Sequence, residues 1–125
     1  MNMFFVLDED NNVVLANGPV HWAKWFQNAT DTRRRWVKET ILEDGTRIST
    51  IFLGINQNWT EIGPPMVFET MIFYGGNFAE DMGQWHHATW SRAAAFHDHL
   101  VNDMADRFSN VDRVLAEVEA LANES

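Results

Sequence analysis

The sequence predicts an α+β fold, with a single antiparallel sheet of about five strands, a short N-terminal helix and a C-terminal helical region packed on one face. Two apolar runs, Ile48 to Ile55 and Met66 to Tyr74, are rich in β-branched and aromatic residues, and we expect them to be central strands. From Trp90 onward, apolar residues recur at helical spacing, as in an amphipathic helix that covers a sheet. The chain has 125 residues, which predicts a single domain over residues 1–125.

The N-terminal segment predicts a hairpin followed by a helix. Apolar residues from Met3 to Leu7 and from Asn12 to Ala16 flank the acidic turn D-E-D-N-N, which indicates two paired strands. Gly18 and Pro19 then start a helix, because proline is tolerated at the first helical position. We expect the aromatic residues of this helix to seal one end of the sheet; they are Trp22, Trp25 and Phe26.

A basic segment leads into the first central run. Its cations are Arg33, Arg34, Arg35 and Lys38. Such a cluster either binds an anion or, as charge on an edge strand, prevents sheets from associating edge to edge. Asp44 and Gly45 then predict the tight turn of a hairpin that leads into Ile48.

Residues 56–65 predict the longest irregular loop, which is closed by two prolines that prevent strand pairing. Trp59 lies in this loop. It is either a plug that anchors the loop or an exposed binding element beside the ends of the central strands.

The last third of the chain predicts a strand and a helical region. The stretch Q-W-H-H-A before Thr89 is typical of a short strand, and Thr89 predicts a helix cap. Ser109, with Asp112 three residues later, predicts a second cap, so the region is either one bent helix or two helices.

Composition and charge exclude several classes of function. The chain has no cysteine, which excludes disulfides, thiolate metal sites and cysteine nucleophiles. It has no basic leader and no apolar run near the roughly 20 residues of a membrane span, so we expect a cytoplasmic protein with no membrane partner. Its net charge of −9 argues against nucleic-acid binding, because phosphate contacts need clustered Lys or Arg.

Glu69 and His97 form the first candidate site. Glu69 lies among apolar side chains in the second run, and burying an unpaired carboxylate is costly. His97 lies on the apolar stripe of the predicted helix and faces the sheet. We therefore predict a Glu69–His97 hydrogen bond, either as a satisfied core pair or as a ligand-binding pair reached from the loop that contains Asn56 and Trp59.

The remaining polar residues of the helix give a weak metal motif and an acidic face. His99 and Asp103 have chelating spacing but lack a third ligand, so we predict no metal, and no sequence feature predicts a cofactor. Asp98, Asp103 and Asp106 form an acidic side that either steers a basic partner or is a solvated helix face. No hydrolase, P-loop, dinucleotide or zinc-protease signature occurs, so we expect a non-enzymatic protein.

Three stretches resemble a family of small uncharacterised proteins of bacteriophages and prophages. They are I-S-T-I-F-L-G-I-N-Q-N-W, P-P-M-V-F-E-T-M-I-F and H-A-T-W-S-R-A-A-A-F-H, which cover about Ser49 to His97. The family typically reads S-T-V-F-L-G-L-D-H, then P-x-L-F-E-T-M-V-F, then T-W-x-x-A-x-x-x-H. Asn56-Gln57 and Arg92 depart from this pattern. Family-like positions are Glu69, Thr70, Trp90 and His97.

The resemblance implies a phage accessory protein, and small proteins of that kind often act by blocking host machinery. We therefore expect a binder that inhibits a host protein, such as a defence component. Two alternatives stay open. One is a small-molecule binding or sequestering protein with a pocket near Trp59, Glu69 and His97; the other is a self-assembling structural or scaffolding component, a homo-oligomer formed through the C-terminal helix.

Overall fold

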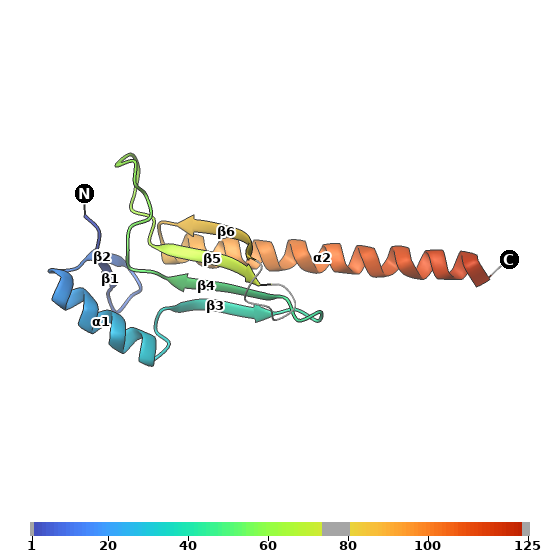
Figure 1. Cartoon of the computed structure of the whole chain (residues 1–125), viewed down its shortest axis with the longest axis horizontal. Helices are drawn as coiled ribbons and strands as arrows, with labels where there is room; N and C mark the ends of the chain where they lie inside the picture. The colour runs from blue at the N-terminus through green and yellow to red at the C-terminus, as the bar shows by residue number, and fades with distance from the viewer. Residues whose placement is uncertain (1, 74–80, 124–125) are drawn as a thin grey trace.

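The computed structural model confirms the α+β class. It describes residues 2–73 and 81–123, apart from the side chains of residues 81–82 and 107–113. The elements in chain order are β1 (Phe5–Leu7), β2 (Val13–Leu15), α1 (Pro19–Asp31), β3 (Trp36–Ile41), β4 (Arg47–Phe52), β5 (Phe68–Phe73), β6 (Asp81–His87) and α2 (Trp90–Asn123). Figure 1 shows α2 running along one face of the β3–β6 sheet, with α1 and the β1–β2 hairpin at one end.

The strands form two sheets, whereas the sequence predicts one. β1 and β2 make an antiparallel hairpin, and β3, β4, β5 and β6 make a four-stranded antiparallel sheet in sequence order. The hairpin strands have three residues each, which is too short to form a full fifth strand. Instead, β1 pairs beside the end of β4, where the Phe5 amide donates to the Gly54 carbonyl at 2.8 Å.

Local turn and cap chemistry explains the element boundaries that the sequence predicts. Pro19 begins α1, as expected. Gly45 has a φ of 88° in the β3–β4 turn, which Asp44 tightens by accepting the Thr46 amide at 2.9 Å. The amide of Arg92 donates to the Thr89 hydroxyl at 3.2 Å, which confirms the cap of α2.

The C-terminal region is one continuous helix of 34 residues. It passes through Ser109 without a break, so the predicted second cap does not start a new helix. The first half of α2 lies against the sheet and the second half extends past its end (Figure 1). Among the described residues, no helix combines the length and the apolar character needed to cross a bilayer.

The core lies between the sheet and its helices and has two parts. One part joins the hairpin, the sheet and the start of α2, and its buried members are Phe5, Leu7, Phe52, Val67, Phe68 and Ala93. The other lies further along α2 and contains Ile48, Ile72 and Met104. Trp25 of α1 packs edge-on against Phe52 at 5.5 Å between ring centroids, which confirms that the aromatic helix closes one end.

The three arginines before β3 bind groups of the chain itself. Arg35 is buried, donates to the Phe52 carbonyl at 2.9 Å, and places its guanidinium 3.8 Å from the Phe26 ring. Arg34 donates to the Asp8 carbonyl at 2.6 Å, and Arg33 stacks on Trp36 at 4.5 Å. These contacts give the basic segment a structural role, holding the turn between α1 and β3 in place.

Candidate functional site

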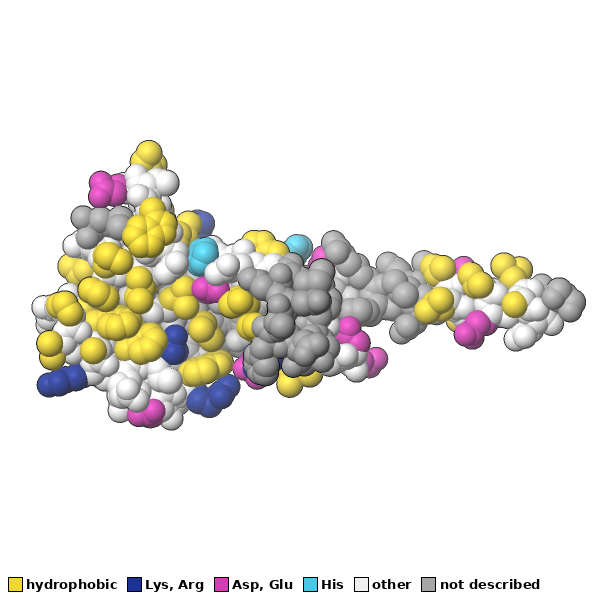
Figure 2. All heavy atoms as spheres, viewed as in Figure 1, with side chains coloured by type: hydrophobic (Ala, Val, Ile, Leu, Met, Phe, Trp, Pro, Cys, Tyr) yellow, Lys and Arg dark blue, Asp and Glu magenta, His cyan; other side chains and the backbone are white. Residues whose placement is uncertain are grey.

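The connection between β4 and β5 rises away from the sheet and presents two apolar side chains to solvent (Figures 1 and 2). We call residues 56–65 the Trp59 loop. Within it, Trp59 is 67% exposed and Ile62 is 81% exposed. Trp59 is therefore not the anchoring plug that the sequence left open as an alternative. Ile62 is a second exposed apolar residue of the loop, which the sequence reasoning missed.

Asn58 ties the tip of the Trp59 loop together with its side-chain amide. Its Oδ1 accepts from the Thr60 amide at 3.1 Å and from the Thr60 hydroxyl at 2.6 Å. Its Nδ2 donates to the carbonyls of Ile62 at 2.8 Å and Pro64 at 3.1 Å. The two donors and the acceptor oxygen of one amide are thus all used inside the loop.

Asn56 closes the base of the same loop. It is buried, and its Oδ1 accepts from the amides of Asn58 at 2.8 Å and Met66 at 3.1 Å. The structure therefore places Asn56, a predicted binding residue, in a supporting position. Because both asparagines fix the backbone, little conformational freedom remains for the loop to lose when Trp59 contacts another surface.

The predicted hydrogen bond between Glu69 and His97 is wrong. Glu69 points to the face of the sheet away from α2, where its Oε1 accepts from Gln84 Nε2 at 2.7 Å and its Oε2 lies 3.6 Å from His86 Nε2. His97 lies on the opposite face, between the sheet and α2. Strand alternation explains the difference, since β5 turns Thr70 toward the helix and Glu69 away from it.

His97 belongs instead to a buried chain of hydrogen bonds, which we call the Thr–His chain. Its members, from one edge of the sheet to the other, are Thr40, His97, Thr50, Thr70 and His87. His97 Nε2 lies 2.8 Å from the Thr40 hydroxyl, and its Nδ1 lies 2.8 Å from the Thr50 hydroxyl. The Thr70 hydroxyl lies 2.8 Å from that of Thr50 and 2.9 Å from His87 Nε2.

The electrostatics of the Thr–His chain point to a structural role. Burial lowers the pKa of His97, an effect that Asp98 partly offsets and Lys38 reinforces. Burial, and to a smaller extent His86, lowers the pKa of His87. Both imidazoles are therefore neutral at neutral pH; His97 uses both ring nitrogens in the chain, and His87 uses Nε2. The sequence reasoning missed Thr40, Thr50 and His87, since their proximity depends on strand register.

The acidic side of α2 is only partly available to a partner. Lys38 Nζ lies 2.7 Å from Asp98 Oδ1, so this carboxylate joins α2 to β3. Asp103 is half-buried and Asp106 is exposed. The ion pair with Lys38 therefore weakens the negative electrostatic field that the sequence predicts from Asp98, Asp103 and Asp106.

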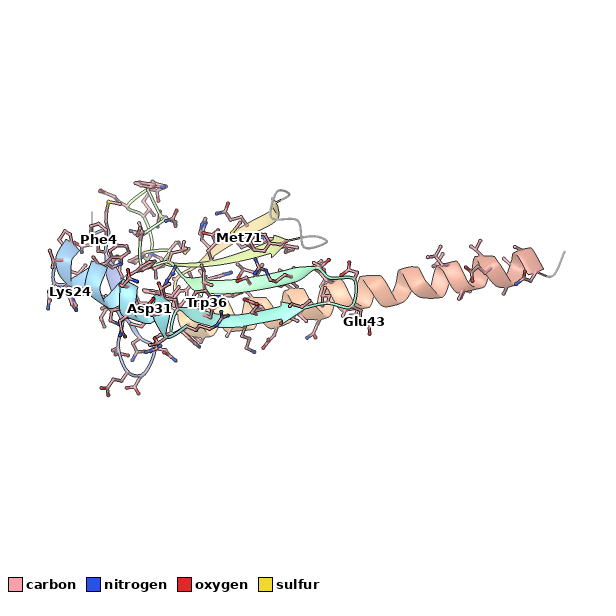
Figure 3. The ribbon with its side chains drawn as sticks, turned by 60° about the horizontal axis from the view of Figure 1, so that its bottom comes forward. Phe4, Lys24, Asp31, Trp36, Glu43 and Met71 are labelled. Atoms are coloured by element: carbon pink, nitrogen blue, oxygen red, sulfur yellow. The ribbon has the colours of Figure 1, made fainter. Side chains whose placement is uncertain are left out.

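A shallow hollow of about 210 Å³ lies on the face of the sheet away from α2, which we call the open face. The residues that line it are Trp36, Glu39, Arg47, Ser49, Ile51, Glu69, Met71 and Phe73. Figure 2 looks onto this face and shows hydrophobic side chains gathered there, and Figure 3 labels Trp36 and Met71 among them. The combination of aromatic, aliphatic and charged groups is typical of a contact surface.

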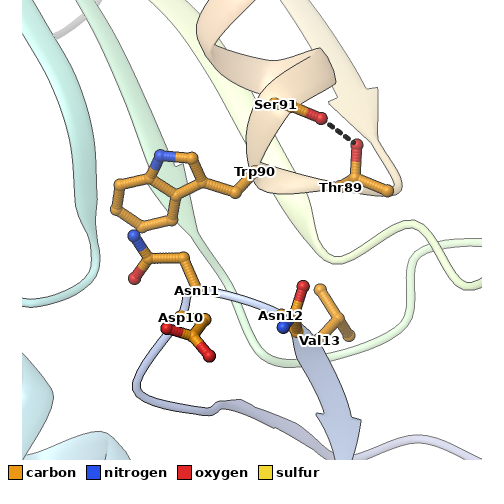
Figure 4. Close-up of a pocket in the computed structure, with 7 residues that line it drawn as sticks. All are labelled: Asp10, Asn11, Asn12, Val13, Thr89, Trp90 and Ser91. Carbon is orange, nitrogen blue, oxygen red and sulfur yellow. Dashed lines mark hydrogen bonds between the residues drawn. The ribbon is translucent and has the colours of Figure 1, made fainter.

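A second hollow, of about 450 Å³, lies between the β1–β2 turn and the start of α2 (Figure 4). Asp10, Asn11 and Asn12 face Thr89, Trp90 and Ser91 across it. The amides at a helix start favour an anion, whereas Asp10 disfavours one. We assign no ligand to this hollow.

The three residues of the predicted small-molecule pocket do not come together. His97 is buried under the sheet, Glu69 lines the hollow of the open face, and Trp59 lines neither of the two hollows described. Among the side chains that the structure describes, no three His, Asp or Glu groups converge on a point where a metal ion could bind.

In the Trp59 loop, side-chain hydrogen bonds to the backbone hold two exposed apolar side chains in place. We compared the chain with protein-family models, with curated proteins and with solved structures, and nothing matches in any of the three.

Proposed function

We propose that the chain is a non-enzymatic protein-binding domain that docks on its partner through Trp59 and Ile62. The observation that carries this proposal is a loop, fixed by its own asparagines, that holds two large apolar side chains in solvent. Burying a side chain of the size of Ile stabilises a complex by about 1.5 to 3 kcal/mol. Trp is enriched among the residues that dominate binding energy, and a pre-ordered loop lowers the entropic cost of association.

The resemblance to phage and prophage proteins supports a host protein in the bacterial cytoplasm as the partner, with inhibition as the result. The net charge of −9 favours a partner with a neutral or basic surface, because complementary charge speeds encounter. A host defence component is one partner of this kind.

The test uses the whole chain as bait in host lysate, alongside a Trp59→Ala/Ile62→Ala variant. The matched control is Val20→Ala on α1, where an apolar residue is 68% exposed outside the loop. We expect a host protein that the parent and the control retain and that the loop variant loses. With that protein purified, calorimetry should give a dissociation constant at least about tenfold weaker for the loop variant.

A further variant, Asn58→Ala, separates contact from pre-ordering. It leaves Trp59 and Ile62 in place but removes four hydrogen bonds of the loop. We expect its dissociation constant to lie between those of the parent and the double variant. If the double variant binds the captured protein as tightly as the parent does, the loop is not the docking surface.

A further inference from the structure

The second half of α2 carries an apolar stripe that stays exposed in the described chain. Its members are Val114, Leu115, Val118 and Leu121, which are 51%, 55%, 56% and 67% exposed. All residues from 114 to 123 are exposed, and we call this segment the α2 overhang. Burying these four apolar side chains against another surface would stabilise the overhang.

The stripe lies on the same side of α2 as the residues that pack on the sheet. Val114, Leu115 and Val118 follow Leu100, Val101 and Met104 by two heptads, and those three residues pack on the chain's own sheet. Two heptads drift by only about 40° around a straight α-helix. Beyond the end of the sheet, the stripe therefore continues to face the side on which the sheet lies.

Among the described residues, the open face of the sheet holds a group of apolar side chains that are only partly buried. Trp36, Ile51, Met71 and Phe73 line the hollow of the open face, and Ile41 beside them is exposed. An antiparallel sheet can leave one face in water, but the strands then usually place polar residues on that face. Here four of the eight residues that line the hollow are aromatic or aliphatic, as on a contact surface.

We propose that the α2 overhang docks on the open face of a second copy of this chain, and that the second copy does the same in return. In this arrangement the sheet of the second copy lies beyond the end of the first sheet and in the same plane. It is rotated by a half turn, so that its open face contacts the stripe of the first copy. A two-fold axis between the copies makes both contacts identical. Each four-stranded sheet then lies between its own α2 and the overhang of its partner.

The dimensions fit this arrangement. The overhang, residues 114–123, spans about 15 Å at about 1.5 Å per residue, and the six-residue strands β4 and β5 span about 20 Å. The overhang contains Glu117 and Glu119 and no basic residue. The open face holds Arg47, stacked 4.6 Å from the Phe73 ring, and two carboxylates, Glu39 and Glu69. Glu39 lies 3.6 Å from Arg33 Nη2 and Glu69 accepts from Gln84 Nε2 at 2.7 Å, so both carboxylates have partners within the chain. Pairing two overhangs instead would bring the acidic residues of both copies together.

The test measures the oligomeric state of the full chain by light scattering during gel filtration, over protein concentrations from micromolar to submillimolar. The parent should have twice the mass of the 14.4 kDa chain. Val118→Glu on the stripe and Met71→Lys on the open face should each weaken the dimer at least tenfold. Ala116→Glu, on the opposite side of the overhang, is the matched control and should stay dimeric.

Mixing the two disrupted variants gives the sharpest outcome. The Val118→Glu chain keeps an intact open face and the Met71→Lys chain keeps an intact overhang, so only the mixture restores one of the two contacts. We expect the mixture to associate, as seen by native mass spectrometry, while each variant alone is monomeric. Circular dichroism checks folding, and Ser49→Arg replaces Met71→Lys if that variant fails to fold.

A monomeric parent over the whole concentration range overturns the proposal. A Met71→Lys chain that stays dimeric, beside a monomeric Val118→Glu chain, also overturns it, in favour of paired overhangs. A dimeric Val118→Glu chain overturns it as well. The Trp59→Ala/Ile62→Ala variant should stay dimeric, so dimer formation and partner binding can each fail without the other.

Discussion

Thr70 is the central link of the Thr–His chain. Its hydroxyl contacts both the Thr50 hydroxyl and His87 Nε2 in the middle of the Thr–His chain. The side chain is fully buried, so water cannot replace these partners.

The near-isosteric change Thr70→Val should therefore lower the free energy of unfolding by about 1 to 3 kcal/mol, because it removes the buried partner of His87 Nε2 and one of the two partners of the Thr50 hydroxyl. Urea denaturation measures the difference. Ser49→Val, on the open face of the neighbouring strand, is the control and should cost less. Equal stability of Thr70→Val and the parent would contradict a structural role for the chain.

The two buried histidines make stability depend on pH in a known direction. Burial lowers the pKa of His97 and His87 below the roughly 6.5 of the unfolded chain. Below about pH 6.5, the unfolded state therefore binds more protons than the folded state. Their contribution is complete above that pH and is lost as the pH falls toward the folded-state values.

We expect the free energy of unfolding to fall between pH 7.5 and pH 5.5, measured by urea denaturation across that range. His97→Gln should reduce the steepness of this fall. An unchanged slope in His97→Gln would show that His97 does not take part in this linkage.

At the level of the elements, the junction after β4 tolerates no side chain. Gly54 has a φ of 72°, and a Cβ there would lie 2.7 Å from Trp22 Nε1 and 3.0 Å from the Phe5 carbonyl oxygen. This close approach lets α1, β1 and the start of the Trp59 loop meet at one point.

Gly54→Ala should lower the free energy of unfolding by about 1 to 3 kcal/mol from backbone strain, and further through the contact with Trp22. Gly45→Ala has a similar φ of 88° but meets no atom within 4 Å, so it isolates the backbone contribution. We expect Gly54→Ala to be the more destabilising in thermal and urea unfolding. Equal losses of unfolding free energy in the two variants would mean that the side chains around Gly54 make room for a Cβ without cost.

Sequence patterns predict those elements that local chemistry defines. Asp44-Gly45 demands a tight turn and Pro19 suits a helix start, so both boundaries follow from the residues themselves. Ser109 failed as a cap because serine costs an α-helix interior only a few tenths of a kcal/mol, which leaves a continuous helix accessible.

The orientation of β5 could not be predicted in the same way. Both of its faces are largely apolar, so alternation alone does not say whether Glu69 or Thr70 points to α2. The register with β4 and β6 settles this by placing Thr70 beside Thr50. Likewise, a lone Trp59 in a loop gives no sequence signal of its exposure, which depends on where Asn56 and Asn58 anchor the backbone.

Across the whole molecule, the residues on which the predicted phage resemblance rests and the residues proposed for docking lie in different places. Thr70 and His97 belong to the Thr–His chain, and Trp90 packs edge-on against Phe68 at 6.2 Å between ring centroids. These positions hold the sheet and α2 together. Asn56 and Gln57, where the sequence departs from the predicted pattern, lie instead at the start of the Trp59 loop, and Asn56 holds the base of that loop through the amides of Asn58 and Met66.

The Thr–His chain also couples the two edges of the sheet through proton position. A hydroxyl donates one hydrogen but can accept two, so the position of the proton on neutral His97 decides how far the coupling extends. With the proton on His97 Nε2, Thr50 must donate to His97 Nδ1, Thr70 must donate to Thr50, and His87 must carry its proton on Nε2. With the proton on His97 Nδ1, the threonine hydroxyls can accept from either side, and the tautomer of His87 is not fixed. The Nε2 tautomer of His97 in α2 therefore fixes the tautomer of His87 in β6.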